Sequence, residues 1–212
     1  MSSEIKSTTL QTNSLKDKTG TRTLASDSGS AWSWGSGLPK GSVIEQFCSP
    51  CDGSSITVQS GSYTVQNVTA SQALTTSFAD VTGSALTYTP PAGTQTVIYD
   101  FLFQWAFVDA NSRFGIKLSI GGTEVTNART YLSSQSSTYT EQTLYFRWAF
   151  NIGGSTTNAT GRQATWTSGK EIKLETREHS SAQEINFHTT YHWEGAENAQ
   201  FNQPTIGITA LA

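Results

Sequence analysis

The chain has 212 residues and a formal net charge of −3; 14% of its residues are charged and 11% are aromatic. This composition excludes a highly charged disordered chain, because aromatic side chains bury the largest area per residue. Lys and Arg form no basic run and the longest apolar stretches are far shorter than a membrane span, so neither nucleic-acid binding nor membrane insertion is expected. The length fits one domain preceded by an extended arm.

Residues 1–41 form the expected arm, because their hydrophobic residues are too widely spaced for a core. SLKDKTGTRTL predicts a small polar hairpin, and SDSGSAWSWGSGLPKG is typical of a Ser/Gly linker that places its two tryptophans on one side of an extended chain. Such an arm becomes ordered only on another surface, most simply on other copies of itself. The candidate assembly contacts are Ile5, Leu10, Leu15, Leu24, Trp32 and Trp34.

From residue 42 onward, apolar and polar residues alternate with the period of a β-strand. SVIEQF predicts a strand, SITVQSGSYTVQNVT predicts a hairpin that turns at Ser60-Gly61, and Pro90-Pro91 ends the next two short strands. TVIYDFLFQWAFVD is the strongest strand of the chain. One of its faces is expected to consist of Val97, Tyr99, Phe101, Phe103, Trp105 and Phe107.

The alternation continues to the end of the chain. GIKLSIGGTEVTNARTYL predicts a hairpin around Gly121-Gly122, EQTLYFRWAFNIGG and KEIKLETRE predict strands, and PTIGITALA predicts the last one. In EINFHTTYHWEG, the period aligns Ile185, Phe187, Tyr191 and Trp193 on one face. No window shows a helical stripe, so the sequence predicts an all-β domain over residues 42–212, a jelly-roll-like antiparallel sandwich.

The two strongest strands are partly apolar on their second face as well, which a sandwich standing alone would expose. Two explanations remain open: neighbouring subunits bury one side of the sandwich, or long loops cover these faces.

The only two cysteines, Cys48 and Cys51, form a C-x-x-C pair. A redox pair of this type precedes a helix, whereas here a turn and another strand follow. A zinc site needs two further ligands, and the nearest histidine in sequence is His179. The pair is therefore interpreted as a turn where the arm enters the sandwich, with no metal bound.

His188 and His192 are expected on one face of a strand, with Glu194 two residues beyond. Such a face either binds a metal or is the solvent-facing side of a half-buried strand, and the second interpretation is favoured. The carboxylates are dispersed, and no pair stands out as a glycosidase needs. No catalytic residue and no cofactor are predicted.

Aromatic residues in hydroxyl-rich, loop-like surroundings suit stacking on sugars or protein interfaces. The candidate surface-binding aromatics are Tyr131, Tyr139 and Trp166. For the two tryptophans of the arm, an interface between copies is the favoured role.

Three segments carry a resemblance: MSSEIKSTTLQTNSLKDKTGTRTLA, WSWGSGLPKGSVIEQF and ALTTSFADVTGSALTYTPPAGTQTVIYDF. They resemble fibre-like and decoration proteins from the virions of marine tailed bacteriophages. The C-terminal domains of that group look like trimeric jelly rolls of the complement/tumour-necrosis-factor type and follow a thin intertwined arm.

The resemblance implies a structural virion protein, assembled in the host cytoplasm, whose arm binds other virion proteins. The first hypothesis is a homotrimeric fibre or appendage protein that contacts a glycan or protein of the host surface. The alternative is a capsid decoration protein that stabilises the shell. A sugar-active enzyme on the same scaffold ranks third, because no facing carboxylate pair can be nominated.

Overall fold

The computed structural model describes the backbone of residues 14–16, 23–27 and 31–34 and, with side chains, residues 38–107, 112–134, 140–181, 183–195 and 198–212. The chain divides into two compact units, Met1–Ser42 together with Ala212, and Val43–Leu211. All regular secondary structure in the described residues is β-strand, which confirms the all-β prediction.

The first unit contains three antiparallel strands, β1 (Ser14–Lys16), β2 (Thr23–Asp27) and β3 (Ala31–Trp34), in the order β1-β2-β3. The predicted hairpin is present as β1–β2. The segment expected to be a plain linker contains the third strand, in which Trp34 lies opposite Leu24 and Trp32 lies opposite Ser26.

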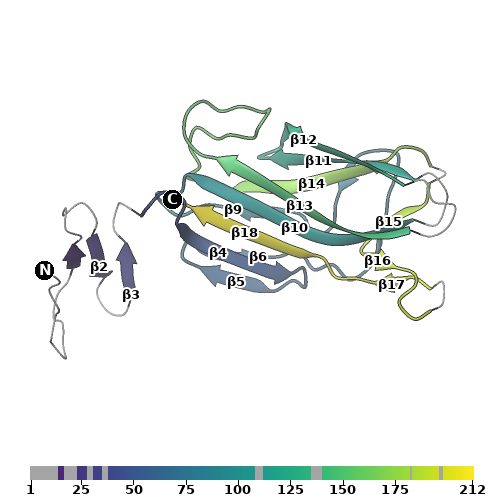
Figure 1. The fold of residues 1–212 in the computed structure, drawn as a ribbon, viewed down its shortest axis with the longest axis horizontal. Helices are drawn as coiled ribbons and strands as arrows, with labels where there is room; N and C mark the ends of the chain where they lie inside the picture. Colours follow the sequence, from purple (N-terminus) through teal and green to yellow (C-terminus); the bar gives the residue numbers. More distant parts are fainter. Residues whose placement is uncertain are drawn as a thin grey trace, which may run out of the picture. The chain divides into compact units, whose positions relative to one another are not determined.

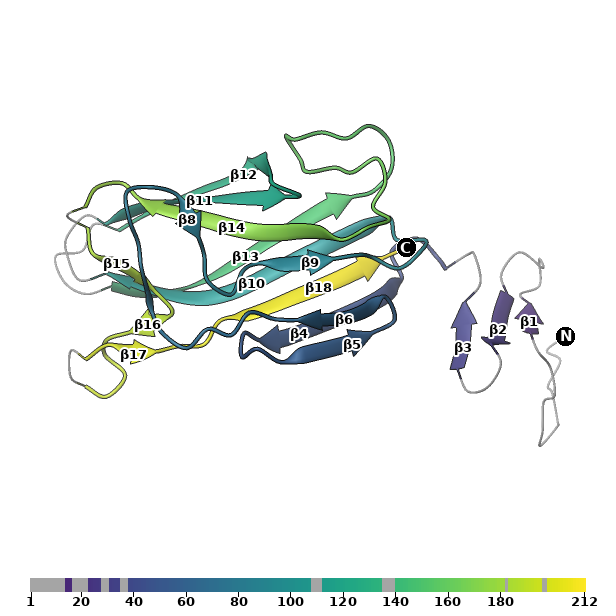
Figure 2. The same ribbon diagram turned by 180° about the vertical axis from the view of Figure 1, so that it is seen from behind.

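Eight strands of the second unit form two facing sheets (Figures 1 and 2). One sheet has the order β4 (Val43–Pro50), β18 (Thr205–Leu211), β10 (Thr96–Phe107) and β13 (Thr140–Asn151). The other has the order β9 (Leu86–Tyr88), β14 (Lys170–Glu178), β11 (Arg113–Ile120) and β12 (Thr123–Ser133). Along the chain, these strands alternate between the sheets except at the β11–β12 hairpin, which is the jelly-roll arrangement.

Short strands extend the two sheets. Beyond the first residue of β18, β15 (Ile185–Phe187) pairs with β10 in its place and pairs in turn with β7 (Gln72–Ala73). In the other sheet, β8 (Ala79–Asp80) pairs with β14. Two hairpins complete the unit: β5 (Ser55–Val58) with β6 (Gly61–Thr64), and β16 (Thr189–Thr190) with β17 (Gln200–Phe201).

Strand β10 defines the two ends of the sandwich. Thr96 pairs with Leu211, at the end where the chain also enters β4; this is called the near end. Phe107 pairs with Ile185 at the opposite end, called the far end. Figure 1 shows β15, β16 and β17 gathered at the far end.

The alternating pattern of β10 correctly predicts the core, since all six side chains of its predicted face are buried. They join the two sheets: the ring centroid of Trp105 lies 4.8 Å from that of Phe114 on β11. On β13, Phe146 and Phe150 are buried as expected. Full burial of one such ring contributes about 1.5–3 kcal/mol to the free energy of unfolding.

The expectation of one continuous strand face over residues 185–193 is wrong. Strand β15 ends at Phe187, and His188 adopts a left-handed backbone conformation with φ of +60°. A single residue of this kind interrupts the period-two alternation, because left-handed backbone does not continue a strand. The residues after it form a separate hairpin.

Candidate functional site

The three candidate surface aromatics have three different outcomes. The Tyr131 side chain, on β12, is 61% exposed. Tyr139 lies outside the described residues. Trp166 is only 4% exposed, so its prediction as a surface aromatic is wrong.

Trp166 is buried although its surroundings in the sequence are polar. Its indole Nε1–H donates a hydrogen bond of 2.9 Å to the carbonyl oxygen of Tyr88, and its ring makes edge-to-face contacts with Tyr88 and Phe150. A buried tryptophan needs a partner for its N–H, and the carbonyl of β9 supplies it. Trp166 therefore anchors the β13–β14 connection to the core.

Trp193 is the exposed tryptophan that sequence reasoning missed. Its side chain is 81% exposed in the turn between β16 and β17, at the far end of the sandwich. The signal for this turn was Gly195, which has a φ of +72°, because glycine adopts such angles without steric cost. A large apolar side chain so fully exposed marks an interaction site better than a scattered Leu or Val does.

Glu141 on β13 holds the hairpin that carries Trp193. Its carboxylate accepts hydrogen bonds from the Thr190 hydroxyl at 2.6 Å, from the backbone N–H of Tyr191, and from that of His192 at 3.0 Å. Partial burial raises the pKa of Glu141, but these hydrogen bonds outweigh it and bring the pKa below its ordinary value. The tryptophan is thus presented on a fastened turn.

The candidate contacts of the arm are only partly described. The backbone pairing places Leu15 opposite Leu24, and Leu24 opposite Trp34 on its other side. Ile5 and Leu10 lie outside the described residues.

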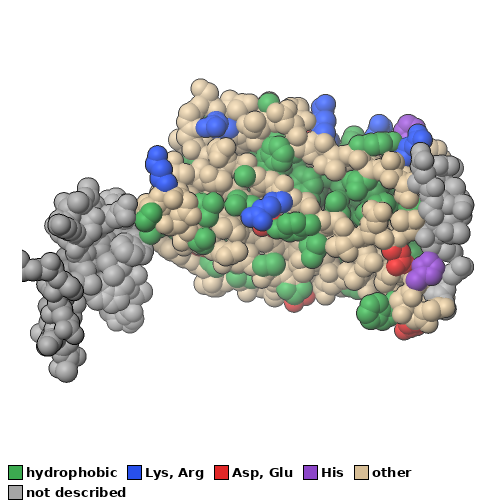
Figure 3. Space-filling model, in the orientation of Figure 1, with side chains coloured by type: hydrophobic (Ala, Val, Ile, Leu, Met, Phe, Trp, Pro, Cys, Tyr) green, Lys and Arg blue, Asp and Glu red, His purple; other side chains and the backbone are tan. Residues whose placement is uncertain are grey.

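The outward face of β4, β18, β10 and β13 is named the assembly face; it includes Ile98, Asp100, Leu102, Tyr145 and Arg147. Leu102 and Tyr145 are cross-strand partners, 38% and 53% exposed. The charges on the next row neutralise each other, because Asp100 accepts a hydrogen bond of 2.7 Å from the Tyr145 hydroxyl and lies 3.4 Å from Arg147 Nε. Figure 3 shows hydrophobic side chains spread over this face around an Arg/Lys group. In Figure 1, no described loop crosses the centre of this face.

The cysteines lie at the end of β4 away from its entry point, so their expected place at the entry of the arm is wrong. Cys48 is exposed and Cys51 is buried, and both are free. Burial raises the pKa of the Cys51 thiol to about 12, with smaller contributions from Asp52 and Cys48. Such a thiol stays protonated and is a poor nucleophile.

The two histidines do not share a face. His188 is fully buried, against the rings of Phe101, Phe103 and Phe187, which contradicts the expected solvent-facing position. Burial lowers its pKa to about 4, although the backbone of Thr82 partly opposes the shift. His192 is exposed beside Glu141.

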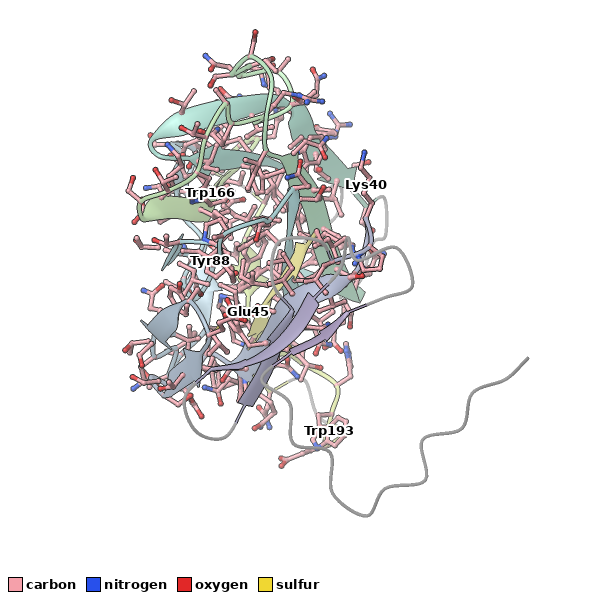
Figure 4. The ribbon with its side chains drawn as sticks, turned by 90° about the vertical axis from the view of Figure 1, so that its left-hand side faces the viewer. Lys40, Glu45, Tyr88, Trp166 and Trp193 are labelled. Atoms are coloured by element: carbon pink, nitrogen blue, oxygen red, sulfur yellow. The ribbon has the colours of Figure 1, made fainter. Side chains whose placement is uncertain are left out.

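A buried carboxylate, Glu45, fastens the near end. It accepts hydrogen bonds from the backbone N–H and the hydroxyl of Ser60, at 2.7 and 2.6 Å, and from the Tyr88 hydroxyl at 2.8 Å. Burial, followed by the bond to Glu45, raises the pKa of Tyr88 well above its usual range. In Figure 4, Glu45, Tyr88 and Trp166 lie in one column through the sandwich, whereas Trp193 lies at its periphery. The column is a structural brace for the β5–β6 turn.

No protein-family model matches the chain, and a search of curated proteins also finds no match. Within the described residues, no group of three or more His, Cys, Asp or Glu side chains is placed to hold a metal ion. The same residues include no helix long and apolar enough to span a bilayer.

Proposed function

We propose that this protein is a structural virion protein of a tailed bacteriophage, a homotrimeric fibre or appendage subunit that attaches to the host surface. The proposal joins the resemblance of the chain to phage fibre-like proteins with the geometry of the sandwich. The observation that carries it is the presentation of Trp193, 81% exposed, on a hairpin at the far end. Tryptophan is enriched among the residues that contribute most to binding at protein surfaces.

The hairpin is fastened before any ligand arrives. Three hydrogen bonds from residues 190–192 to the Glu141 carboxylate hold the turn next to Trp193. Such preorganisation increases affinity, because less conformational freedom is lost on binding. Attachment through the far end leaves the near end, where the chain enters β4, free for anchoring.

Trimer formation through the assembly face supports the same function. The charges at its centre, Asp100 and Arg147, form a pair, and the Glu141 carboxylate nearer the far end accepts hydrogen bonds from the β16–β17 hairpin, so identical copies present little unpaired charge to one another there. Its apolar side chains, Leu102 and Tyr145 among them, are exposed in one chain and become buried between copies. A closed ring of three copies would present three Trp193 side chains to one surface, which increases avidity.

The location of the protein on the virion tests the proposal. An antibody against residues 43–211, labelled with gold, is expected to mark the tail or its fibres in electron micrographs of virions that carry this chain. Label distributed over the head would replace attachment with capsid decoration. The absence of label from every virion would reject both functions.

A binding experiment tests the role of Trp193 directly. Fluorescent full-length protein is expected to stain cells of the strain that propagates the phage, and Trp193→Ala should reduce staining by about tenfold or more. Phe201→Ala is the matched control, because it removes another exposed ring of the same hairpin. Equal staining by Trp193→Ala and by the unchanged protein would contradict the proposal.

A further inference from the structure

A second candidate surface lies on the outward face of β12, β11 and β14, around Gly115. Gly115 on β11 is the cross-strand partner of Tyr131 on β12 and of Arg177 on β14. Arg113 and Lys117 are two residues before and after it on the same strand and therefore share its face. These five residues form the Gly115 platform, which extends roughly 10 Å across the strands and 13 Å along them.

The centre of the platform is bare. A Cβ atom added at Gly115 would meet no atom within 4 Å. The backbone of Gly115 is not in the left-handed region that favours glycine, so no turn geometry requires this residue. The space above Gly115 is therefore open, between the four larger side chains of the platform.

The border is cationic and aromatic. Among the residues that the structure describes, no carboxylate forms an ion pair with Arg113 or Arg177. Arg177 instead lies over the ring of Phe78, with 5.4 Å between its Cζ and the ring centroid. Lys117 Nζ is 4.5 Å from the same centroid and 3.2 Å from Glu175 Oε1. Two guanidinium groups thus remain available to an anion, and the ring fixes one of them.

From this arrangement we infer that the Gly115 platform binds an acidic glycan, a polysaccharide that carries carboxylate or sulfate groups. The exposed ring of Tyr131 offers a flat surface for stacking on a sugar ring, and the open space at Gly115 admits that ring close to the backbone. The two arginines match the anionic groups through paired N–H donors. The inference names the ligand class for the attachment proposed above and rests on that function.

The charge of the whole chain argues against a nucleic acid as the ligand. The formal net charge is −3, and the platform supplies three cations, one of which is paired with Glu175. A duplex requires a longer stripe of cations to replace its counterions. A glycan whose acidic groups are far apart can be bound by a few cations at one place on the surface.

The test measures binding of full-length protein to immobilised alginate, to chondroitin sulfate, to neutral dextran and to a DNA duplex. Retention on at least one of the acidic polymers, weaker in higher salt and absent on dextran, is expected. Arg113→Glu combined with Arg177→Glu should weaken this retention by about tenfold or more, because attraction becomes repulsion. Lys170→Glu, at the other end of β14, is the matched control and should change it little.

Gly115→Phe provides a second variant in case the double variant fails to fold. It occupies the open space at Gly115 without backbone strain, so it should weaken retention by about tenfold at an unchanged melting temperature. The inference is overturned if dextran or DNA binds as tightly as the acidic polymers, or if neither variant changes retention. If gold marks the tail but no acidic polymer is retained, attachment stands and the glycan inference fails. If acidic polymers are retained but no virion is labelled, attachment fails and glycan binding stands.

Discussion

The two outward faces of the sandwich differ in charge although one fold produces both. At the centre of the assembly face, β10 and β13 carry one charged pair, Asp100 with Arg147. Glu141 lies on the same face nearer the far end, where it holds the β16–β17 hairpin. On the opposite face, every second residue of β11 and β14 points outward, and several of these residues are charged. They form ion pairs such as Lys117 with Glu175 and Lys173 with Asp80. The difference shows that the fold requires only inward-facing apolar residues, so the charge of each outward face can vary independently of the core.

A change in the core should destabilise the whole sandwich, and its effect can be compared with that of changes made on one outward face alone. Phe103 is buried and packs on Phe101 and Phe187. Phe103→Ala should lower the free energy of unfolding by about 3–5 kcal/mol, because it removes buried area and leaves a cavity. Urea unfolding measures this loss, and self-association and surface binding should fail together. A loss below about 1 kcal/mol would contradict the assigned core.

Acid should lower the free energy of unfolding through His188, which is buried in the same core. The folded pKa of His188 is about 4, below the ordinary value of about 6.5. Between these values the unfolded chain binds a proton that the folded chain does not, so stability falls as the pH decreases from 6.5 to 4. The contribution amounts to about 3 kcal/mol in total.

Urea unfolding at pH 7, 5.5 and 4 measures this effect. The control is His188→Asn, because Asn tolerates the left-handed backbone and does not titrate in this range. The variant should be less stable at pH 7 but should lose less further stability in acid. An equal acid slope in both proteins would exclude His188 as the source.

A charge placed at the apolar centre of the assembly face should weaken self-association of the protein. Leu102→Glu places a charge where copies are expected to meet, and should weaken association by about 2 kcal/mol or more for each contact. Light scattering after size exclusion is expected to give three times the mass of one chain for the unchanged protein and a smaller mass for the variant. Thr126→Glu on the exposed side of β12 is the control. Identical masses for all three proteins would reject the assembly face.

The smallest effect is expected on the charged face. Lys173 Nζ lies 2.7 Å from Asp80 Oδ1, and the Asp80 side chain is largely exposed. Lys173→Gln should change the free energy of unfolding by less than about 1 kcal/mol, because water and salt screen such a pair. Urea unfolding in low and high salt measures it. A loss well above that value would show that this face is structural and not simply solvated.

Local patterns correctly predicted the strands and most of their buried faces. The period of β10 identified all six of its buried side chains, and Gly121-Gly122 identified the β11–β12 turn. These predictions succeed because successive side chains of a strand point to opposite sides, whatever the strand pairs with. The hairpin of β1 and β2 was predicted for the same reason.

The proposed binding surfaces were harder to predict, because they join residues from distant parts of the chain. Tyr131, Gly115 and Arg177 become neighbours only when β11 pairs on both sides. Trp193 was placed on the same strand face as Ile185 and Phe187 because the alternation was continued through His188, whose left-handed backbone ends it. The spacing of residues contains no information on either event.

The sequence by itself determined that this chain is an all-β sandwich with a poorly core-forming N-terminal segment, because hydrophobic period and spacing act locally along each strand. Only the tertiary structure decided which tryptophan is buried and which is exposed. Trp166 enters the core because the carbonyl of Tyr88 on a distant strand accepts its N–H, and Trp193 remains outside because Glu141, some fifty residues earlier, holds its turn. Both outcomes depend on long-range partners that a polar loop sequence does not specify.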